Sequence, residues 1–263
     1  MSRLDVRFAD CARDNRAALV TYICAGDPDF DICLELLQGL HAAGADIIEL
    51  GMPFSDPTAD GPTIQAAALR ALQGGQNQQR TLELVRRFRE QNQSTPLVLM
   101  GYYNPIHRYG GADFIRDAAA AGVDALLVVD LPPEHDNELG PAARDAGLQM
   151  IRLATPTTDA QRLPRVLEHA SGFLYYVSHN GVTGVGAADH TAVAQALEGI
   201  RAQSSVPICV GFGVRRAEQA APLAQVADGV VVGSALIEAL QQGGVAAALG
   251  MTAELAAAMP RQA

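Results

Sequence analysis

Short apolar runs alternate with longer amphipathic stretches along most of the chain. The runs are rich in valine, isoleucine and leucine, and each has the length of a buried strand. Strands are expected at residues 18–24, 45–50, 96–101, 124–129, 148–153, 172–177, 206–210 and 228–232. These runs are apolar throughout rather than alternately apolar and polar, which is typical of parallel strands with both faces covered by helices.

Helical periodicity occupies the stretches between these strands. Helices are expected at residues 30–43, 63–72, 81–91, 112–121, 134–146, 159–170, 191–203, 215–223 and 234–240. A short amphipathic helix is expected before the first strand, over residues 3–15, with Leu4, Phe8 and Cys11 on one face. The alanine-rich tail, residues 244–263, is also expected to be helical.

Eight successive strand–helix units predict an α/β fold, a single (β/α)8 TIM barrel that spans residues 1–263 as one domain. The N-terminal extra helix and the helical C-terminal tail are additions to that barrel. An open doubly wound sheet is the structural alternative. That fold normally carries a GxGxxG turn after its first strand, whereas Gly26-Asp27-Pro28 follows the first strand here.

The loop after the second expected strand is the most unusual segment of the chain. Glu49 stands near the end of the apolar run, and the loop that follows holds three prolines, Asp56, Asp60 and Gly61. A strand-to-helix connection usually needs roughly 2–6 residues, and this one is about twice as long. Partial burial would raise the pKa of Glu49 and suit it to proton transfer near neutral pH. The alternative is that Asp60 only caps a helix whose first turn holds Pro62.

Composition then narrows the possible chemistry. The chain has 263 residues, 49% of them hydrophobic, and its formal net charge of −10 argues against nucleic acid or an anionic membrane as a partner. All nineteen basic residues are arginine, so neither a lysine imine nor covalent attachment of pyridoxal phosphate is possible in this chain. The four cysteines and six histidines show no metal-ligand spacing, so no metal site is expected. No apolar run approaches the roughly 20 residues of a membrane span, no signal-peptide core is present, and a cytoplasmic protein with reduced thiols is expected.

Polar and aromatic residues follow other expected strands. Tyr102 follows the third strand, Asp130 follows the fourth and Tyr175 lies in the sixth. In a TIM barrel the carboxyl ends of the strands carry the active site, so these residues and Glu49 are expected to line one pocket. Asp130 is given a supporting role only.

Glycine-rich loops follow the last three expected strands. Gly211-Phe212-Gly213 follows the seventh strand, and Gly233-Ser234 follows the eighth and opens a helix. Phosphate groups commonly bind at these two loops of a TIM barrel, against a helix N-terminus. The loop at 178–186 carries three glycines and is interpreted as a lid over the substrate, the alternative being an ordinary surface loop. His179 is treated as a loop residue, because no serine or cysteine partner for it is visible.

Five motifs along the chain are distinctive. They are ELGMPFSDPTADGP (49–62), MGYYNP (100–105), VDLPPE (129–134), GVTG (181–184) and GFG (211–213). Together they resemble the tryptophan synthase α subunit family, and the resemblance extends from about residue 19 to about residue 240. The resemblance implies retro-aldol cleavage of indole-3-glycerol phosphate to indole and glyceraldehyde 3-phosphate. It implies no cofactor in this chain, and a β-subunit partner that holds pyridoxal phosphate and receives the indole through a tunnel, in an α2β2 heterotetramer.

The family's roles are carried over to the matching positions. Glu49 matches the general acid–base, Asp60 the carboxylate that binds the indole N–H, and Thr183 the lid residue that meets the Asp60 loop on closure. The resemblance implies substrate contacts at Tyr22, Met100, Tyr102, Leu127, Tyr175, Thr183 and Phe212, and phosphate contacts at Gly184, Gly213, Gly233 and Ser234. The sequence departs from the family at Thr58, often leucine, and at His179, usually arginine. The first departure bears on the subunit contact or loop packing, and the second on lid closure and its signal to the partner.

Elementary chemistry agrees with the reaction that the resemblance implies. Aldol cleavage needs an electron sink, and without a lysine imine or a metal cluster an indole ring protonated at C3 can supply one. Glu49 is the candidate proton donor, and Asp60 is the candidate anion to stabilise the resulting iminium near N1. The glycerol hydroxyl proton passes either to Glu49 or to a bound water. Two alternatives stay open: another phosphate-binding barrel, an isomerase or epimerase, and a non-catalytic subunit that only activates its partner.

Overall fold

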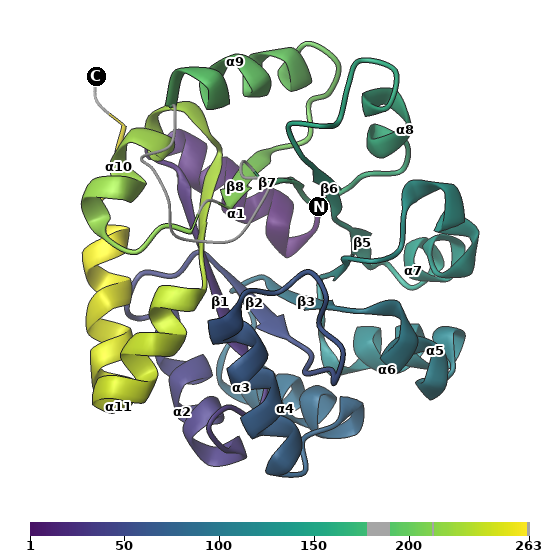
Figure 1. The fold of residues 1–263 in the computed structure, drawn as a ribbon, viewed down its shortest axis with the longest axis vertical. Coiled ribbons are helices and arrows are strands. Elements are labelled where there is room, and N and C mark those ends of the chain that lie inside the picture. Colours follow the sequence, from purple (N-terminus) through teal and green to yellow (C-terminus); the bar gives the residue numbers. More distant parts are fainter. Residues whose placement is uncertain (178–189, 212, 262–263) are drawn as a thin grey trace.

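The computed structural model describes residues 1–177, 190–211 and 213–261. Its strands are β1 (Ala18–Cys24), β2 (Ile47–Gly51), β3 (Leu97–Gly101), β4 (Ala125–Val128), β5 (Gln149–Met150), β6 (Arg152–Ala154), β7 (Leu174–Val177), β8 (Ile208–Gly211) and β9 (Gly229–Val232). Its helices are α1 (Arg3–Arg13), α2 (Phe30–Leu40), α3 (Pro62–Gln73), α4 (Gln78–Gln91), α5 (Tyr103–Tyr109), α6 (Gly111–Ala121), the 3-10 helix η1 (Pro133–Glu138), α7 (Gly140–Asp145), α8 (Leu163–Leu167), α9 (His190–Arg201), α10 (Ala217–Val226) and α11 (Ser234–Ala256). Figure 1 shows the strands at the centre and the helices around them.

The strands form one parallel sheet that closes into a barrel. Their order is β5-β4-β3-β2-β1-β9-β8-β7-β6, and the two ends of this order, β5 and β6, are separated in the chain only by Ile151. β5 pairs with β4 and β6 pairs with β7, while the Ile151 N–H donates to the Leu126 carbonyl at 2.9 Å. The strand predicted at 148–153 is therefore two short pieces that join the sheet edges. The predicted (β/α)8 TIM barrel is confirmed.

Prolines account for two of the helices that differ from the prediction. The helix predicted at 134–146 is broken between η1 and α7, and the one predicted at 159–170 is shortened to α8. Pro141 and Pro164 lie in the first turns of α7 and α8, and proline has no N–H to donate inside a helix, so each helix starts there. The seven-residue α5 is absent from the predicted helices, because its single buried residue, Ile106, gives no helical period.

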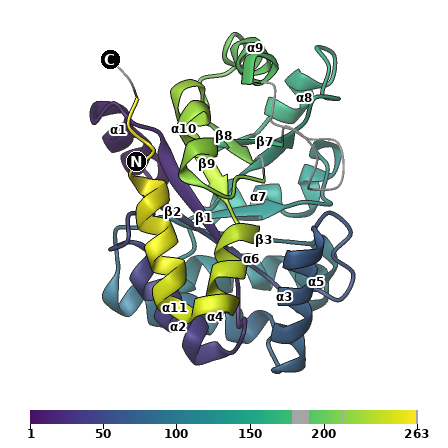
Figure 2. The same cartoon turned by 60° about the vertical axis from the view of Figure 1, so that its left-hand side comes forward.

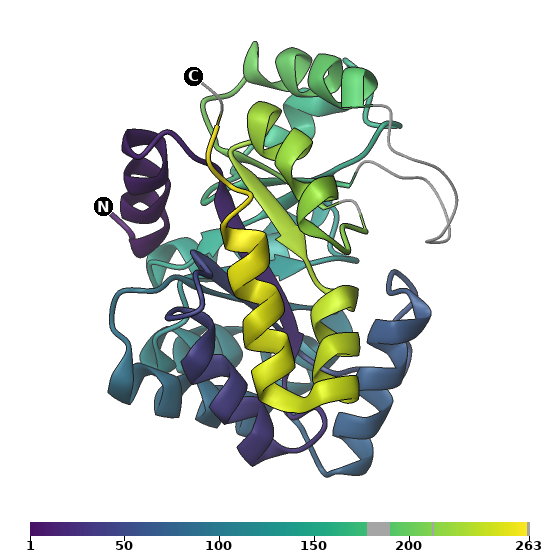
Figure 3. The same cartoon turned by 90° about the vertical axis from the view of Figure 1, so that its left-hand side faces the viewer.

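The C-terminal tail continues the last helix of the barrel. α11 joins the helix predicted at 234–240 to the predicted helical tail, and Gly244 interrupts it with a φ of 69°, a conformation that favours glycine. Figure 3 shows α11, in yellow-green to yellow, as two arms that meet at an angle. Beyond the helix, the Met259 carbonyl accepts from the Ala17 N–H at 3.0 Å, which ties the tail to the start of β1. None of the described helices combines the length and hydropathy of a membrane span.

The predicted N-terminal helix, α1, closes the barrel at the amino ends of the strands. Leu4, Phe8 and Cys11 are buried on one face, as expected, and pack in one cluster with inward-facing strand residues such as Val20. The Phe8 ring meets the Phe173 ring edge-on, with centroids 6.0 Å apart. The barrel interior is therefore apolar and filled by side chains at this end.

Aspartates that stand just before three strands hold the amino ends of the barrel together. Asp46, Asp124 and Asp228 each accept a hydrogen bond from a backbone N–H of the neighbouring strand. The donors are Leu19, Leu97 and Ile208, at 2.9, 2.8 and 2.9 Å. Each carboxylate thus satisfies a backbone group that the end of the sheet would otherwise leave unpaired.

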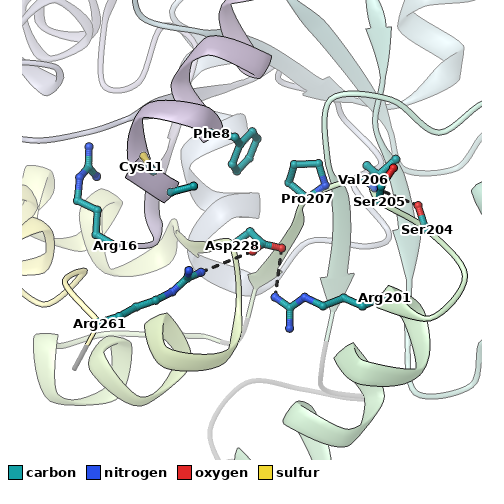
Figure 4. Close-up of a pocket in the computed structure, with 11 residues that line it drawn as sticks. Phe8, Cys11, Arg16, Arg201, Ser204, Ser205, Val206, Pro207, Asp228 and Arg261 are labelled. Atoms are coloured by element: carbon teal, nitrogen blue, oxygen red, sulfur yellow. Dashed lines mark hydrogen bonds and ion pairs between the residues drawn. The ribbon is translucent and has the colours of Figure 1, made fainter. Parts of the chain in front are cut away.

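Arginines neutralise all three of these carboxylates. The pairs are Arg16 and Arg7 with Asp46, Arg89 and Arg3 with Asp124, and Arg201 and Arg261 with Asp228, at 2.6, 3.5, 2.7, 2.9, 3.2 and 3.5 Å. Figure 4 shows the last group, in which Asp228 lies between its two arginines at a cavity of about 360 Å³. The Asp46 side chain is only 4% exposed, so removal of this carboxylate leaves a buried backbone N–H and a closely packed arginine without their acceptor.

Asp46→Ala should lower the free energy of unfolding by about 3 kcal/mol, because it removes the acceptor of the Leu19 N–H and the carboxylate that pairs with Arg16 and Arg7. Urea unfolding followed by circular dichroism measures this change. The control is Asp10→Ala, which breaks the exposed pair of Asp10 with Arg13 at 2.8 Å on α1 and should change stability by less than about 0.5 kcal/mol. Equal effects of the two substitutions would contradict the role given to Asp46.

Candidate active site

Glu49 lies inside the barrel, on β2. Parallel register places it beside Tyr22 of β1 and Val98 of β3. The residue is fully buried, and neither carboxylate oxygen has a hydrogen-bond partner among the described residues. Burial, and to a lesser degree the negative charge of Asp60, raises the pKa of the Glu49 carboxyl to about 8. Glu49 is therefore largely protonated at neutral pH and can donate a proton.

Asp60 lies in the loop between β2 and α3. The Tyr102 hydroxyl donates to Asp60 Oδ2 at 3.0 Å and accepts from the Ala59 N–H at 3.0 Å. The Phe54 ring packs on the Tyr102 ring, with centroids 5.4 Å apart. Burial raises the pKa of Asp60, and the hydrogen bond from Tyr102 opposes that rise. Tyr102 thus acquires a role that the sequence does not indicate, because its hydroxyl holds the loop that carries Asp60.

The alternative role of Asp60 as a helix cap is wrong. Pro62 opens α3 as expected, but Gly61 is the N-cap residue and no side chain caps this helix among the described residues. The Asp60 carbonyl accepts from Gln65 Nε2 at 2.7 Å, so the backbone of Asp60 is tied to α3. Its carboxylate accepts a hydrogen bond from Tyr102 instead of capping the helix.

Tyr22 on β1 and Tyr175 on β7 are two buried tyrosines whose hydroxyls are affected by the charges of Glu49 and Asp60. Burial raises the pKa of both hydroxyls well above the usual value, and Glu49 and Asp60 add to the rise. Each ring fills the space beside a glycine at a strand end, Gly51 for Tyr22 and Gly211 for Tyr175, where a Cβ would overlap the tyrosine. A glycine at each of these strand ends is the sequence feature that leaves room for the aromatic walls.

Met100 and Leu127 are paired in register on β3 and β4 and face the barrel interior. Leu127 is buried, Met100 is partly exposed, and both belong to the apolar cluster that also contacts Tyr175. An apolar wall of this kind suits an aromatic ligand. The structure therefore brings Met100 and Leu127 to the same interior surface of the barrel as Tyr22 and Glu49.

The loops after β8 and β9 lie next to each other, because these two strands are paired. Gly213 has a φ of 63°, a conformation that strains any other residue. Gly233 is the N-cap of α11, no side chain caps that helix among the described residues, and Ser234 is its first residue. A Cβ on Gly233 would come within 3.1 Å of Tyr22, so this turn packs directly on the site. Uncapped N–H groups at such a turn are a ready anion site.

Several predicted positions lie outside the described residues, namely His179, Thr183, Gly184 and Phe212. Their contributions stay predictions. Asp130 accepts from the Tyr103 N–H at 2.7 Å, which joins the end of β4 to the start of α5 and fits the supporting role expected for it. Thr58 lies exposed in the Asp60 loop.

The groups available for chemistry at this end of the barrel are carboxyls and tyrosine hydroxyls. Within the described residues no group of three or more histidine, cysteine, aspartate or glutamate side chains is placed to hold a metal ion. All four cysteines are free and buried. What the geometry defines is a TIM-barrel enzyme that carries out acid–base chemistry on an anionic, partly apolar substrate.

Comparison with known proteins gives the family. The family model described as tryptophan synthase alpha chain matches residues 8–260, and the chain belongs to this family. It is a lyase of tryptophan biosynthesis whose reaction, the α reaction of tryptophan synthase, cleaves indole-3-glycerol phosphate. The family carries no cofactor and pairs with a β subunit, which holds the pyridoxal phosphate. The resemblance found in the sequence is confirmed.

Solved structures agree over nearly the full length of the chain. The α subunit of tryptophan synthase from Legionella pneumophila str. Paris is 38% identical, with a TM-score of 0.91 and 98% of each chain covered. A tryptophan synthase structure from Mycobacterium tuberculosis is 40% identical, with a TM-score of 0.92 and 98% of each chain covered. A chain from Aquifex aeolicus VF5 is 35% identical, with a TM-score of 0.92 and all of each chain covered.

The buried Glu49 predicts a characteristic loss of stability with rising pH. The folded state keeps the Glu49 proton up to about pH 8, whereas the unfolded chain releases it near 4.5. Between these values the folded state binds more protons, so the free energy of unfolding falls as pH rises and levels off above the folded pKa. Each tenfold difference in proton affinity is worth about 1.4 kcal/mol, so the loss amounts to several kcal/mol.

Urea unfolding of wild type and Glu49→Gln at about pH 5 and about pH 9 checks this effect. The variant should gain stability relative to wild type as pH rises, because glutamine has no proton to lose. Glu35→Gln, at an exposed position on α2, serves as control and should follow wild type. A difference between wild type and Glu49→Gln that does not change with pH would contradict the buried acid.

Tyr102→Phe should lower the turnover number for indole release about tenfold, since it removes the hydrogen bonds to Asp60 and Ala59, each worth about 1 kcal/mol. The matched control is Tyr103→Phe, whose hydroxyl donates to Glu138 at 2.8 Å on the exposed surface. That variant should stay within about twofold of wild type. Steady-state kinetics of the isolated chain compares the two variants. Equal turnover numbers for both would contradict the role of the Tyr102 hydroxyl in holding Asp60.

Proposed function

We propose that Glu49 protonates C3 of the indole ring of indole-3-glycerol phosphate and that Asp60 stabilises the cation so formed. The observation that carries this proposal is the full burial of Glu49 without a hydrogen-bond partner among the described residues, which raises its pKa to about 8. An acid with a pKa near the working pH is suited to general acid catalysis. Asp60 is the other carboxylate whose charge acts on Glu49.

The bond changes balance as follows. The Glu49 proton moves to indole C3, and the positive charge is delocalised to N1, whose N–H faces the Asp60 carboxylate. The bond between C3 and the glycerol carbon then breaks, and its electron pair restores the indole ring. The hydroxyl on that carbon becomes the aldehyde of glyceraldehyde 3-phosphate, and its proton passes to the Glu49 carboxylate or to a bound water.

The phosphate and the indole ring of the substrate are assigned to different parts of the site, at the carboxyl ends of the strands. We assign the phosphate to backbone N–H groups at Gly184, Gly213 and Gly233, with the Ser234 N–H and hydroxyl, since such turns bind anions without a cationic side chain. The indole ring is assigned to an apolar surface made by Tyr22, Met100, Leu127, Tyr175 and Phe212. Tyr102 holds Asp60, and Thr183 is assigned to the lid that meets the Asp60 loop.

The indole product passes to the β subunit, and we infer an α2β2 heterotetramer. Thr58 lies exposed in the Asp60 loop, which suits a position at the subunit contact, and His179 is assigned to the lid. Four free thiols are typical of a cytoplasmic protein, which is where we place the reaction. We also infer that residues 1–263 fold as one domain with no nucleic acid or membrane partner, in line with the net charge of −10.

Glu49→Gln should lower indole release at least about 1,000-fold, because glutamine keeps the size of the side chain but has no transferable proton. Indole formation from indole-3-glycerol phosphate is measured with the isolated chain and again with a β subunit. Asp56→Asn, an exposed carboxylate of the same loop, is the control and should stay within about threefold. A Glu49→Gln variant that is folded and retains most of its turnover would refute the proposed acid.

A further inference from the structure

Three segments far apart in the sequence meet at Glu238, beside the mouth of the barrel. Glu238 lies on α11, four residues after Ser234. Its Oε1 accepts from the Thr63 hydroxyl at 3.1 Å and from Arg215 Nη1 at 3.2 Å, and its Oε2 accepts from Arg215 Nη2. Figures 2 and 3 show the first turns of α11 beside α3, which carries Thr63. One carboxylate thus joins α3, α11 and the connection after β8.

Both partners of Glu238 belong to segments of the proposed site. Thr63 is the second residue of α3 and follows Asp60 by three positions. Arg215 follows Gly213 by two positions, in the connection between β8 and α10. Glu238 therefore links the segment of Asp60 to the turns at Gly213 and Gly233, two of the segments that are assigned to the phosphate.

The contact between α3 and α11 combines an apolar cluster with polar links. Ala67, Ala68 and Ala71 of α3 pack in one cluster with Ile237 of α11 and with Tyr22. Farther along both helices, Arg70 of α3 donates to the side-chain oxygen of Gln241 of α11 at 2.8 Å. The hydrogen bond from Thr63 to Glu238 lies closer to Asp60 in the chain. Because a hydrogen bond has a preferred length and angle, this bond sets the position of the first turn of α3 relative to the first turns of α11.

Arg215 explains how a carboxylate is tolerated close to a phosphate site. A lone negative charge one turn from Ser234 would repel a bound phosphate. The two-pronged contact with the Arg215 guanidinium balances that charge and leaves Oε1 able to accept from Thr63 as well. The Arg215 and Glu238 side chains are 54% and 28% exposed, so the pair adds little to stability and matters for placement.

We propose that Glu238 is a positioning residue for the α reaction: through Thr63 it fixes the Asp60 segment relative to the phosphate-binding turn, while Arg215 balances its charge. The inference rests on the roles proposed above for Asp60 and Ser234. A substrate anchored by its phosphate at α11 then presents its ring nitrogen to Asp60 at a set distance. Small misplacements of a charged group in a site are costly to the rate.

The test is steady-state indole release by the full chain. Glu238→Ala and Thr63→Val should each lower the turnover number about tenfold while KM stays within about threefold. The double variant should be no slower than either single variant, because both remove one link. Glu238→Gln keeps an acceptor for Thr63 and should restore most of the turnover. Arg215→Gln leaves Glu238 charged and unbalanced and should raise KM for the phosphate substrate.

The matched control is Glu168→Ala, which removes an exposed pair with Arg165 just beyond the end of α8 and should leave turnover unchanged. Urea midpoints confirm that every variant is folded. Wild-type turnover in Glu238→Ala, losses that add in the double variant, or no rescue by Glu238→Gln would each overturn the inference. The proposed function fails on a different result, retention of turnover by Glu49→Gln, so the two failures are distinguishable.

Discussion

The site depends on one costly arrangement, an ionisable carboxyl inside an apolar barrel. Glu49 is fully buried, and among the described residues no donor reaches either of its oxygens. Ionisation of Glu49 there would cost free energy, so the carboxyl stays protonated at neutral pH because the closed barrel buries it. Closure at Ile151 and the packing of α1 at the other end are therefore part of the chemistry as well as of the fold.

The two ends of the barrel use aspartate in opposite ways. At the amino ends of the strands, Asp46 and Asp124 are neutralised by arginine and by backbone N–H groups, which makes them structural. At the carboxyl ends, Glu49 and Asp60 have no arginine among the causes of their pKa shifts. Carboxylates thus stabilise one end of the barrel, and at the other end they are the groups to which we assign the reaction, as the TIM-barrel fold permits.

Local sequence patterns predict much of this fold and site. The remaining features depend on contacts between segments that are far apart in the chain. The strands and Glu49 were predictable because an apolar run with a carboxylate near its end is a local signal. The break before α7 follows from Pro141, but whether proline starts or ends a helix depends on tertiary packing. The contacts of Tyr102 with Asp60 and of Glu238 with Thr63 join distant segments through common residue types, so no local pattern reveals them.

The absence of lysine is compatible with a protonated carboxyl at Glu49. A cationic side chain beside Glu49 would favour the carboxylate and lower its pKa, and the proton would be lost before it could be used. Phosphate binding at the turns of Gly213 and Gly233, as proposed, avoids this, since helix and backbone dipoles act over short range at the rim. Arg215, a cation near the rim, is held by Glu238. A phosphate bound at these turns would add negative charge at the mouth, so the pKa of Glu49 would rise further once the substrate is in place.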